Sequence, residues 1–125
     1  MFWTVGGHRL WAHRSFKTRL PFRILLVILQ TMTMNGSAFS YARDHRTHHK
    51  HSDTEADPKN PSAGLLYAHI GWWCFDKSSI VKDAGSKLDF SDLTKDWVVW
   101  GQHRWYKALF ALFGVLLPVA IPVHF

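Results

Sequence analysis

Apolar residues along this chain are gathered in a few blocks. The longest block runs without interruption from Ala108 to Val123, and Arg104 and Lys107 precede it. Cations in that place are typical of the cytosolic flank of a spanning helix. Sixteen apolar residues only just fail to cross a bilayer, because a span needs about 20. We therefore expect residues 105–125 to be the start of a transmembrane helix.

A buried helix of a soluble domain is the other interpretation of this block. Pro118 and Pro122 count against it, because proline disrupts the interior of a helix.

The second apolar block is shorter and is followed by a strongly polar run. Ile24 to Leu29 are continuously apolar, and Pro21 suits a first helical turn. The block is too short to span a membrane, so residues 21–50 are expected to form one long helix at the membrane surface. Asn35 and Gly36 are the weak point of that helix.

The remaining segments complete an all-α plan. Residues 52–64 are rich in Asp, Pro, Asn, Ser and Gly and should form a loop. Residues 65–104 mix aromatic with charged side chains, which is consistent with short interfacial helices. We expect a membrane protein fragment with the end of a membrane helix at residues 1–5 and a cytosolic or interfacial region at residues 6–104.

Charge and cysteine content narrow the partners. Fifteen Lys and Arg against nine Asp and Glu give a formal charge of +6. This excess favours nucleic acid, phospholipid headgroups or a phosphorylated ligand, without choosing among them. The single cysteine, Cys74, excludes an internal disulfide framework. Between Trp73 and Phe75 it is expected to be a small buried apolar residue.

A histidine cluster in DHRTHH carries the clearest chemical signal. His45, His48 and His49 stand at positions i, i+3 and i+4, which share one face of a helix. Neutral imidazoles on one face can bind iron, zinc, copper or nickel. The other interpretation is a solvated basic helix end. His51 points elsewhere and is expected to be solvated.

Each metal-bound imidazole needs a partner on its second ring nitrogen, usually a carboxylate or a carbonyl. The carboxylates close in sequence to the cluster are Asp44, Asp53, Glu55 and Asp57.

A second pair of histidines lies in HRLWAH. His8 and His13 are five residues apart, so a regular helix would separate them by about 140°. Joint ligation therefore requires a helix end or an irregular turn, which Gly6 and Gly7 would permit. Two histidines at this spacing are also common by chance.

Other kinds of site find little support. The chain has no His-Glu-x-x-His motif, and Ser15, Ser37, Ser40 and Cys74 lack the context of a catalytic nucleophile. The isolated histidines are expected to be structural or interfacial: His69, His103 and His124.

Three segments in order, GGHRLWAHRSFK, RDHRTHHKHSDTEADP and the aromatic stretch containing GWW, resemble the acyl-CoA desaturases of animals. HRLWAH resembles that family's H-x4-H box and HRTHH its first H-x2-HH box. The resemblance covers nearly the whole chain and makes residues 1–125 part of a single fatty acid desaturase domain. It implies an endoplasmic-reticulum membrane enzyme, with histidine boxes facing the cytosol, that acts on fatty acyl-CoA with O2 and cytochrome b5 electrons.

The same resemblance implies the site residues. Two iron ions would be held by His8, His13, His45, His48 and His49. The acyl-CoA would contact Tyr41, Arg43, Asp44 and Lys77. Tyr41 stands where the family usually has Trp, near the bend of the acyl chain. Asp76-Lys77 replaces a basic pair that contacts the CoA phosphates, and Asn35-Gly36 replaces Gln-Asn.

Two alternatives remain open from the sequence. One is a related histidine-box lipid hydroxylase, and the other is a basic membrane-surface binding protein with incidental histidines. For the desaturase the expected partners are the fatty acyl-CoA, cytochrome b5 and membrane lipids, with no nucleic acid. The family's third box is missing here, so we expect the 125-residue chain alone to be inactive.

Overall fold

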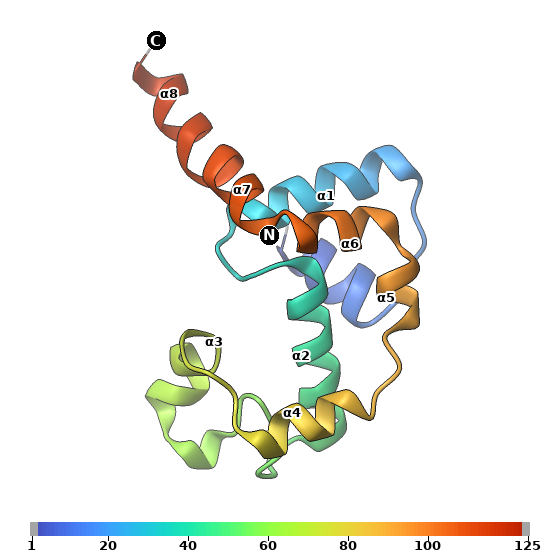
Figure 1. Ribbon diagram of the computed structural model, residues 1–125, viewed down its shortest axis with the longest axis vertical. Helices are drawn as coiled ribbons and strands as arrows, with labels where there is room; N and C mark the ends of the chain where they lie inside the picture. Colours follow the sequence, from blue (N-terminus) through green and yellow to red (C-terminus); the bar gives the residue numbers. More distant parts are fainter. Residues whose placement is uncertain (1–2, 124–125) are drawn as a thin grey trace. The chain divides into compact units, whose positions relative to one another are not determined.

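The computed structural model describes residues 3–123, which form helices and no strand (Figure 1). The fold class expected from the sequence, all-α, is confirmed. The chain divides into two compact units. Unit 1 takes in residues 3–42 and 91–123 of the described range, and unit 2 is Arg43–Phe90. Helix α2 (Ala38–His51) begins in unit 1 and continues into unit 2.

The other elements of unit 1, in chain order, are η1 (Thr4–Ala12), α1 (Leu20–Met32), α5 (Ser91–Lys95), α6 (Trp97–Arg104), α7 (Tyr106–Phe110), η4 (Ala111–Leu116) and α8 (Leu117–Val123). The remaining elements of unit 2 are η2 (Pro61–Ala63), η3 (Tyr67–Gly71), α3 (Trp72–Cys74) and α4 (Ser79–Ser86). Residues 52–60 between α2 and η2 are turns, as expected of a polar loop.

The core of unit 1 lies where α1 packs against α6 (Figure 1). A polar network crosses this apolar contact. The Gln102 side chain donates to Thr31 Oγ1 at 3.0 Å and accepts from the Ala38 N–H at 2.9 Å. All three residues are almost fully buried. A buried amide that finds both partners ties α1, the start of α2 and α6 together.

The expectation of a single helix over residues 21–50 was wrong. The α1 helix ends at Met32, and α2 begins at Ala38. Between them Met34 and Gly36 have φ angles of 60° and 73°, a left-handed conformation that ends a helix. Ser37 Oγ then accepts from the Ser40 N–H at 3.1 Å and caps α2. Asn35-Gly36 was a weak point strong enough to break the helix.

The C-terminal apolar block is helical from Tyr106 through α8. No single helix within residues 3–123 has both the length and the apolar character for a membrane span. The helix Trp97–Arg104 and the helix Tyr106–Ile121 meet these requirements only as a pair, with a bend of 83° between them. Membrane insertion of residues 105–125 therefore stays a prediction, and residues 124–125 lie outside the described range, as do residues 1–2 of the membrane helix end expected at residues 1–5.

Candidate metal-binding histidines

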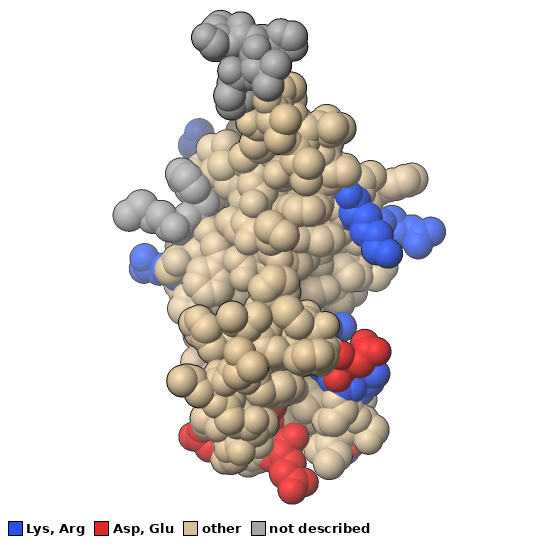
Figure 2. Space-filling view, turned by 90° about the vertical axis from the view of Figure 1, so that its left-hand side faces the viewer, with Lys and Arg blue, Asp and Glu red and all other residues tan. Residues whose placement is uncertain are grey.

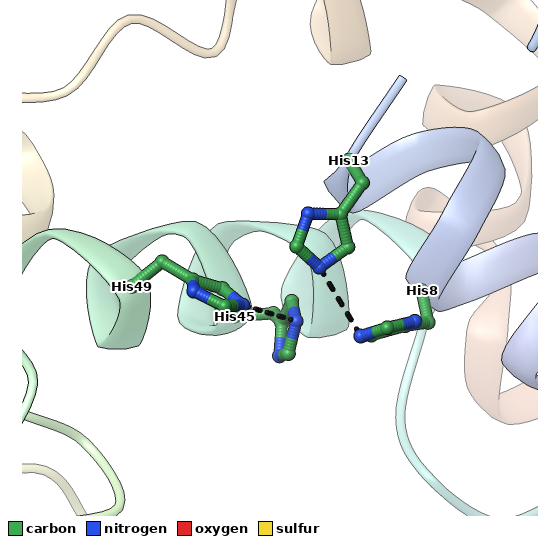
Figure 3. A group of neighbouring side chains, drawn as sticks. All are labelled: His8, His13, His45 and His49. Atoms are coloured by element: carbon green, nitrogen blue, oxygen red, sulfur yellow. Dashed lines mark hydrogen bonds between the residues drawn. The ribbon is translucent and has the colours of Figure 1, made fainter. Parts of the chain in front are cut away.

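His8 lies in the π-helix η1, and His13 directly follows that helix. The His13 N–H donates to the His8 carbonyl at 2.9 Å, an i to i+5 bond. This wider turn brings positions i and i+5 onto one side, where a regular helix would part them. The two Nε2 atoms are 3.1 Å apart, with ring centroids at 4.4 Å (Figure 3). The irregular turn that the sequence required for joint ligation is present.

Two glycines let η1 approach the rest of unit 1. A Cβ atom at Gly7 would lie 2.8 Å from Gln30 Oε1 and 3.0 Å from Tyr41 Cδ1. A Cβ atom at Gly6 would lie 3.0 Å from the Trp11 ring. A contact of 2.8 Å essentially never occurs for a real Cβ atom, and one of 3.0 Å is tighter than most. A side chain at either glycine would therefore force its neighbours to shift.

Replacing Gly7 by Ala should therefore lower the free energy of unfolding by about 1–3 kcal/mol, the usual cost of overpacking a dense site. The matched control is Gly101→Ala in α6, where an added Cβ meets no atom within 4 Å. That variant should gain up to about 1 kcal/mol, because alanine favours a helix interior over glycine. Thermal unfolding of the two variants in detergent measures the difference, and equal stabilities would show that η1 does not need Gly7.

His45 and His49 form the second pair, one turn apart on α2 within unit 2. Their Nε2 atoms are 3.0 Å apart, and their ring centroids are 4.6 Å apart (Figure 3). Two nitrogens bound at right angles to one metal, each about 2.1 Å from it, would be about 3.0 Å apart. Each pair, taken by itself, thus has the spacing of two ligands on a common ion. His8, His13, His45 and His49 are thus candidate metal ligands.

His48 is held in a different way from its two neighbours. Its Nδ1 donates to Asp57 Oδ1 at 2.7 Å, and its ring centroid lies 6.1 Å from that of His45 and 5.5 Å from that of His49. Only 1% of Asp57 is exposed. The Asp57 carboxylate also accepts from the Lys59 N–H at 2.8 Å and the Asp53 N–H at 3.1 Å. This leaves Nε2 of His48 as the nitrogen that could bind a metal.

Among the four carboxylates considered from the sequence, Asp57 is the one that contacts a histidine in unit 2. Asp53 and Glu55 are exposed. Asp44 was a wrong choice for this role, because its carboxylate is taken by two cations. Oδ1 accepts from Arg43 Nε at 2.9 Å, and Oδ2 pairs with Lys77 Nζ.

The three residues of unit 2 that were assigned to the acyl-CoA, Arg43, Asp44 and Lys77, therefore form one ion cluster. Asp44 is 6% exposed, and it compensates part of the positive charge that the two cations would offer to a phosphate. No sequence pattern pointed to Lys59, which lies in unit 2 close enough to Asp44 and Asp57 for their charges to affect it. Its ammonium lies 4.4 Å from the Trp72 ring centre, and burial lowers its pKa against the opposing effects of Asp44 and Asp57.

Tyr41, the fourth residue assigned to the acyl-CoA, is buried in unit 1. Its ring meets that of Trp3 edge to face, with centroids 5.0 Å apart, and 2% of the residue is exposed. Burial raises the pKa of its hydroxyl, so the phenol stays neutral throughout the physiological range.

The other single residues gave mixed results. Cys74 is exposed, which corrects the expectation of a buried apolar role. It is the last residue of the short helix α3. His103 has the structural role expected: its Nδ1 lies 2.7 Å from Ser37 Oγ, and its ring packs beside Phe39. His69 is exposed, His51 is half-buried, and His124 lies outside the described residues.

Comparison with known proteins identifies close relatives over nearly the whole chain. The chain is 45% identical over 122 residues to stearoyl-CoA desaturase of Homo sapiens, covering 98% of this chain and 34% of that protein. It is 46% identical over 122 residues to Delta(9)-fatty-acid desaturase fat-6 of Caenorhabditis elegans, covering 98% and 36%. Stearoyl-CoA desaturase 4 of Mus musculus is 44% identical over 119 residues, covering 95% and 34%. The chain thus spans about a third of the length of these relatives. No protein-family model matches it.

Proposed function

The chain is homologous to the stearoyl-CoA and delta-9 fatty-acid desaturases over nearly its whole length, and we propose from this that the complete protein is an acyl-CoA desaturase. The observation that carries the proposal is the pairing of histidines within the homologous segment. His8 with His13, and His45 with His49, each bring two Nε2 atoms to about 3 Å. Imidazole is a ligand that suits iron.

The iron ligands in the complete protein are His8, His13, His45, His48 and His49, with further ligands from the rest of the protein. Two irons are the proposed cofactor, as the resemblance to the desaturases implies. When bound, iron supplies the activation of O2 that side chains cannot provide. The bond from His48 Nδ1 to Asp57 fixes the tautomer of His48, which would leave its Nε2 unprotonated and able to hold the metal.

The proposed reaction removes two hydrogens from neighbouring carbons of a saturated acyl chain and forms a carbon–carbon double bond. The two hydrogens, one O2, two electrons and two further protons give two waters. Cytochrome b5 is the proposed electron donor, and the acyl-CoA is the proposed substrate. The proposed location is the endoplasmic reticulum membrane, with the histidines on the cytosolic side. A lipid hydroxylase would instead insert one oxygen atom into a C–H bond of its substrate.

Expression of the complete protein in desaturase-deficient membranes, with a saturated acyl-CoA, reductant and O2, tests this proposal. The expected product is the acyl-CoA with one double bond, and chelation of iron should abolish its formation. A hydroxylated product would favour the hydroxylase. Lipid binding that is unaffected by chelators, with no product of either kind, would favour a binding protein.

Tyr41 is proposed to set the acyl-chain preference, because it stands one helical turn before His45 on α2. Tyr41→Trp should change the ratio of products from acyl-CoAs of different length by several-fold, while expression stays near that of the wild type. The neighbouring Phe39→Trp, which changes an aromatic residue packed beside His103, is the matched control. An unchanged product profile in the Tyr41 variant would place Tyr41 away from the acyl chain.

A further inference from the structure

A hollow in unit 1 lies at the 83° bend between α6 and the apolar helix that follows it. It has a volume of about 450 Å³, within the range of small-molecule sites. Its lining comes from the α1–α2 connection, the start of α2 and the residues around the bend. The polar residues in this lining are Ser37, Ser40, His103, Arg104, Tyr106 and Lys107.

The charge of this hollow is positive throughout. Arg104 and Lys107 are both exposed, no carboxylate lines the hollow, and within the described part of the chain neither cation forms an ion pair. This contrasts with Arg14, Arg23, Arg43 and Lys77, each of which faces an aspartate. Two uncompensated cations beside hydroxyl groups form a site for a phosphate group.

Two serine hydroxyl groups that line the hollow are held by hydrogen bonds. Ser37 is 3% exposed, and its Oγ lies 3.0 Å from Ser40 Oγ and 2.7 Å from His103 Nδ1. When Ser37 donates to Ser40, the Ser40 hydroxyl retains its own hydrogen to donate to an anion.

The surface next to the hollow indicates which phosphate it takes. From Ala108 onward the helix carries no Lys, Arg, Asp or Glu, as the face in Figure 2 shows. Apolar side chains are exposed along it: Leu112, Val115, Leu116, Leu117, Val119 and Ile121. Trp105 stands at its start and is 66% exposed, which is typical of the level of lipid headgroups. A soluble phosphate has no apolar part that could contact this surface, whereas a phospholipid has two acyl chains that can pack along it.

We propose that this hollow binds the phosphate of an anionic phospholipid, held by Arg104 and Lys107 with Ser40, while the acyl chains follow the helix that begins at Ala108. The site shares no residue with the proposed metal ligands, and the proposal does not depend on desaturase activity. Basic pockets at the membrane face of helices bind anionic headgroups in this way.

In the test, the purified complete protein is placed in nanodiscs that contain phosphatidylcholine and a minor fraction of phosphatidylserine. The protein is then washed with detergent, and mass spectrometry measures the phospholipid that it retains. Wild type should retain phosphatidylserine preferentially. Arg104→Gln and Lys107→Gln should each weaken that retention about fivefold, and together about 25-fold. The charge-conserving pair Arg104→Lys with Lys107→Arg should retain the lipid.

The matched control removes the same charge elsewhere, by Lys82→Gln with Lys95→Gln. Both of these lysines are exposed and lie outside the hollow. Undiminished phosphatidylserine retention in the Arg104/Lys107 double variant would overturn the proposal. A second arm titrates inorganic phosphate and coenzyme A at constant ionic strength. If the double variant loses binding of either compound but keeps the lipid, the hollow is a site for a soluble phosphate, and the lipid assignment is wrong.

Discussion

Replacing His49 by Ala in the complete protein should reduce the formation of unsaturated acyl-CoA by at least about 100-fold. His49 supplies one of two Nε2 atoms that lie 3.0 Å apart, so its loss leaves His45 without the partner of a chelating pair. The His49 side chain is exposed, and its removal leaves no cavity in the core. Product formed from a saturated acyl-CoA, normalised to the amount of protein in the membrane, measures the effect.

The control for His49 is His51→Ala, two residues along the same helix. His51 was expected to point away from the cluster, because it lies about 240° from His45 around a regular helix. This variant should keep nearly all of the activity. An equal loss of activity in both variants would mean that the activity depends on the intact end of α2, and not on His49 as a metal ligand. Near-normal activity of His49→Ala would remove His49 from the metal assignment.

Replacing Asp57 by Asn should lower activity and metal affinity by about 10- to 100-fold, the usual effect of removing the partner of a metal-bound histidine. The Asp57 carboxylate accepts three hydrogen bonds, from His48 Nδ1 and from the N–H groups of Lys59 and Asp53. An amide has one oxygen, so its NH2 group must face at least one of these donors. With its oxygen in the Oδ1 position the amide can still accept from His48 Nδ1, but a neutral amide is a weaker acceptor than a carboxylate and holds the tautomer of His48 less firmly.

Glu55→Gln removes the same charge from the same loop and is the matched control for Asp57. Glu55 is exposed, so its replacement should change neither activity nor the free energy of unfolding measurably. Metal affinity is followed by competition with a chelator, and protein stability by thermal unfolding. If Asp57→Asn loses stability but binds metal as tightly as the wild type, Asp57 acts only as a brace for the loop after α2.

Local patterns predicted the parts of this fold that depend on neighbouring residues. The spacing of His45, His48 and His49 placed them on one helix, and α2 carries all three. The polar composition of residues 52–64 predicted the turns that follow. The homology to desaturases was also visible in the histidine motifs themselves, and the identity of about 45% confirmed it.

Features that depend on packing between distant segments were not predictable from local patterns. The break at residues 33–37 is stabilised by Gln102, which is 64 residues away from Ala38, the residue it contacts. Lys77 pairs with Asp44 across 33 residues of sequence. Asp44 therefore contacts a distant lysine, where its position beside the cluster had suggested a histidine. Gly6 and Gly7 indicated from the sequence that an irregular turn could join His8 to His13. The close packing of η1 against Gln30 and Tyr41 was not predictable, because those residues are distant in sequence.

The iron content of the purified complete protein tests the central claim most directly. Elemental mass spectrometry would measure the iron content of the wild type and of a variant in which His8, His13, His45 and His49 are all replaced by Ala. Circular dichroism would check that the two proteins are equally folded. We expect about two iron ions per chain in the wild type and almost none in the variant. Equal iron in the two proteins, or a folded wild type that performs desaturation without iron, would contradict the assignment of these histidines to a metal centre.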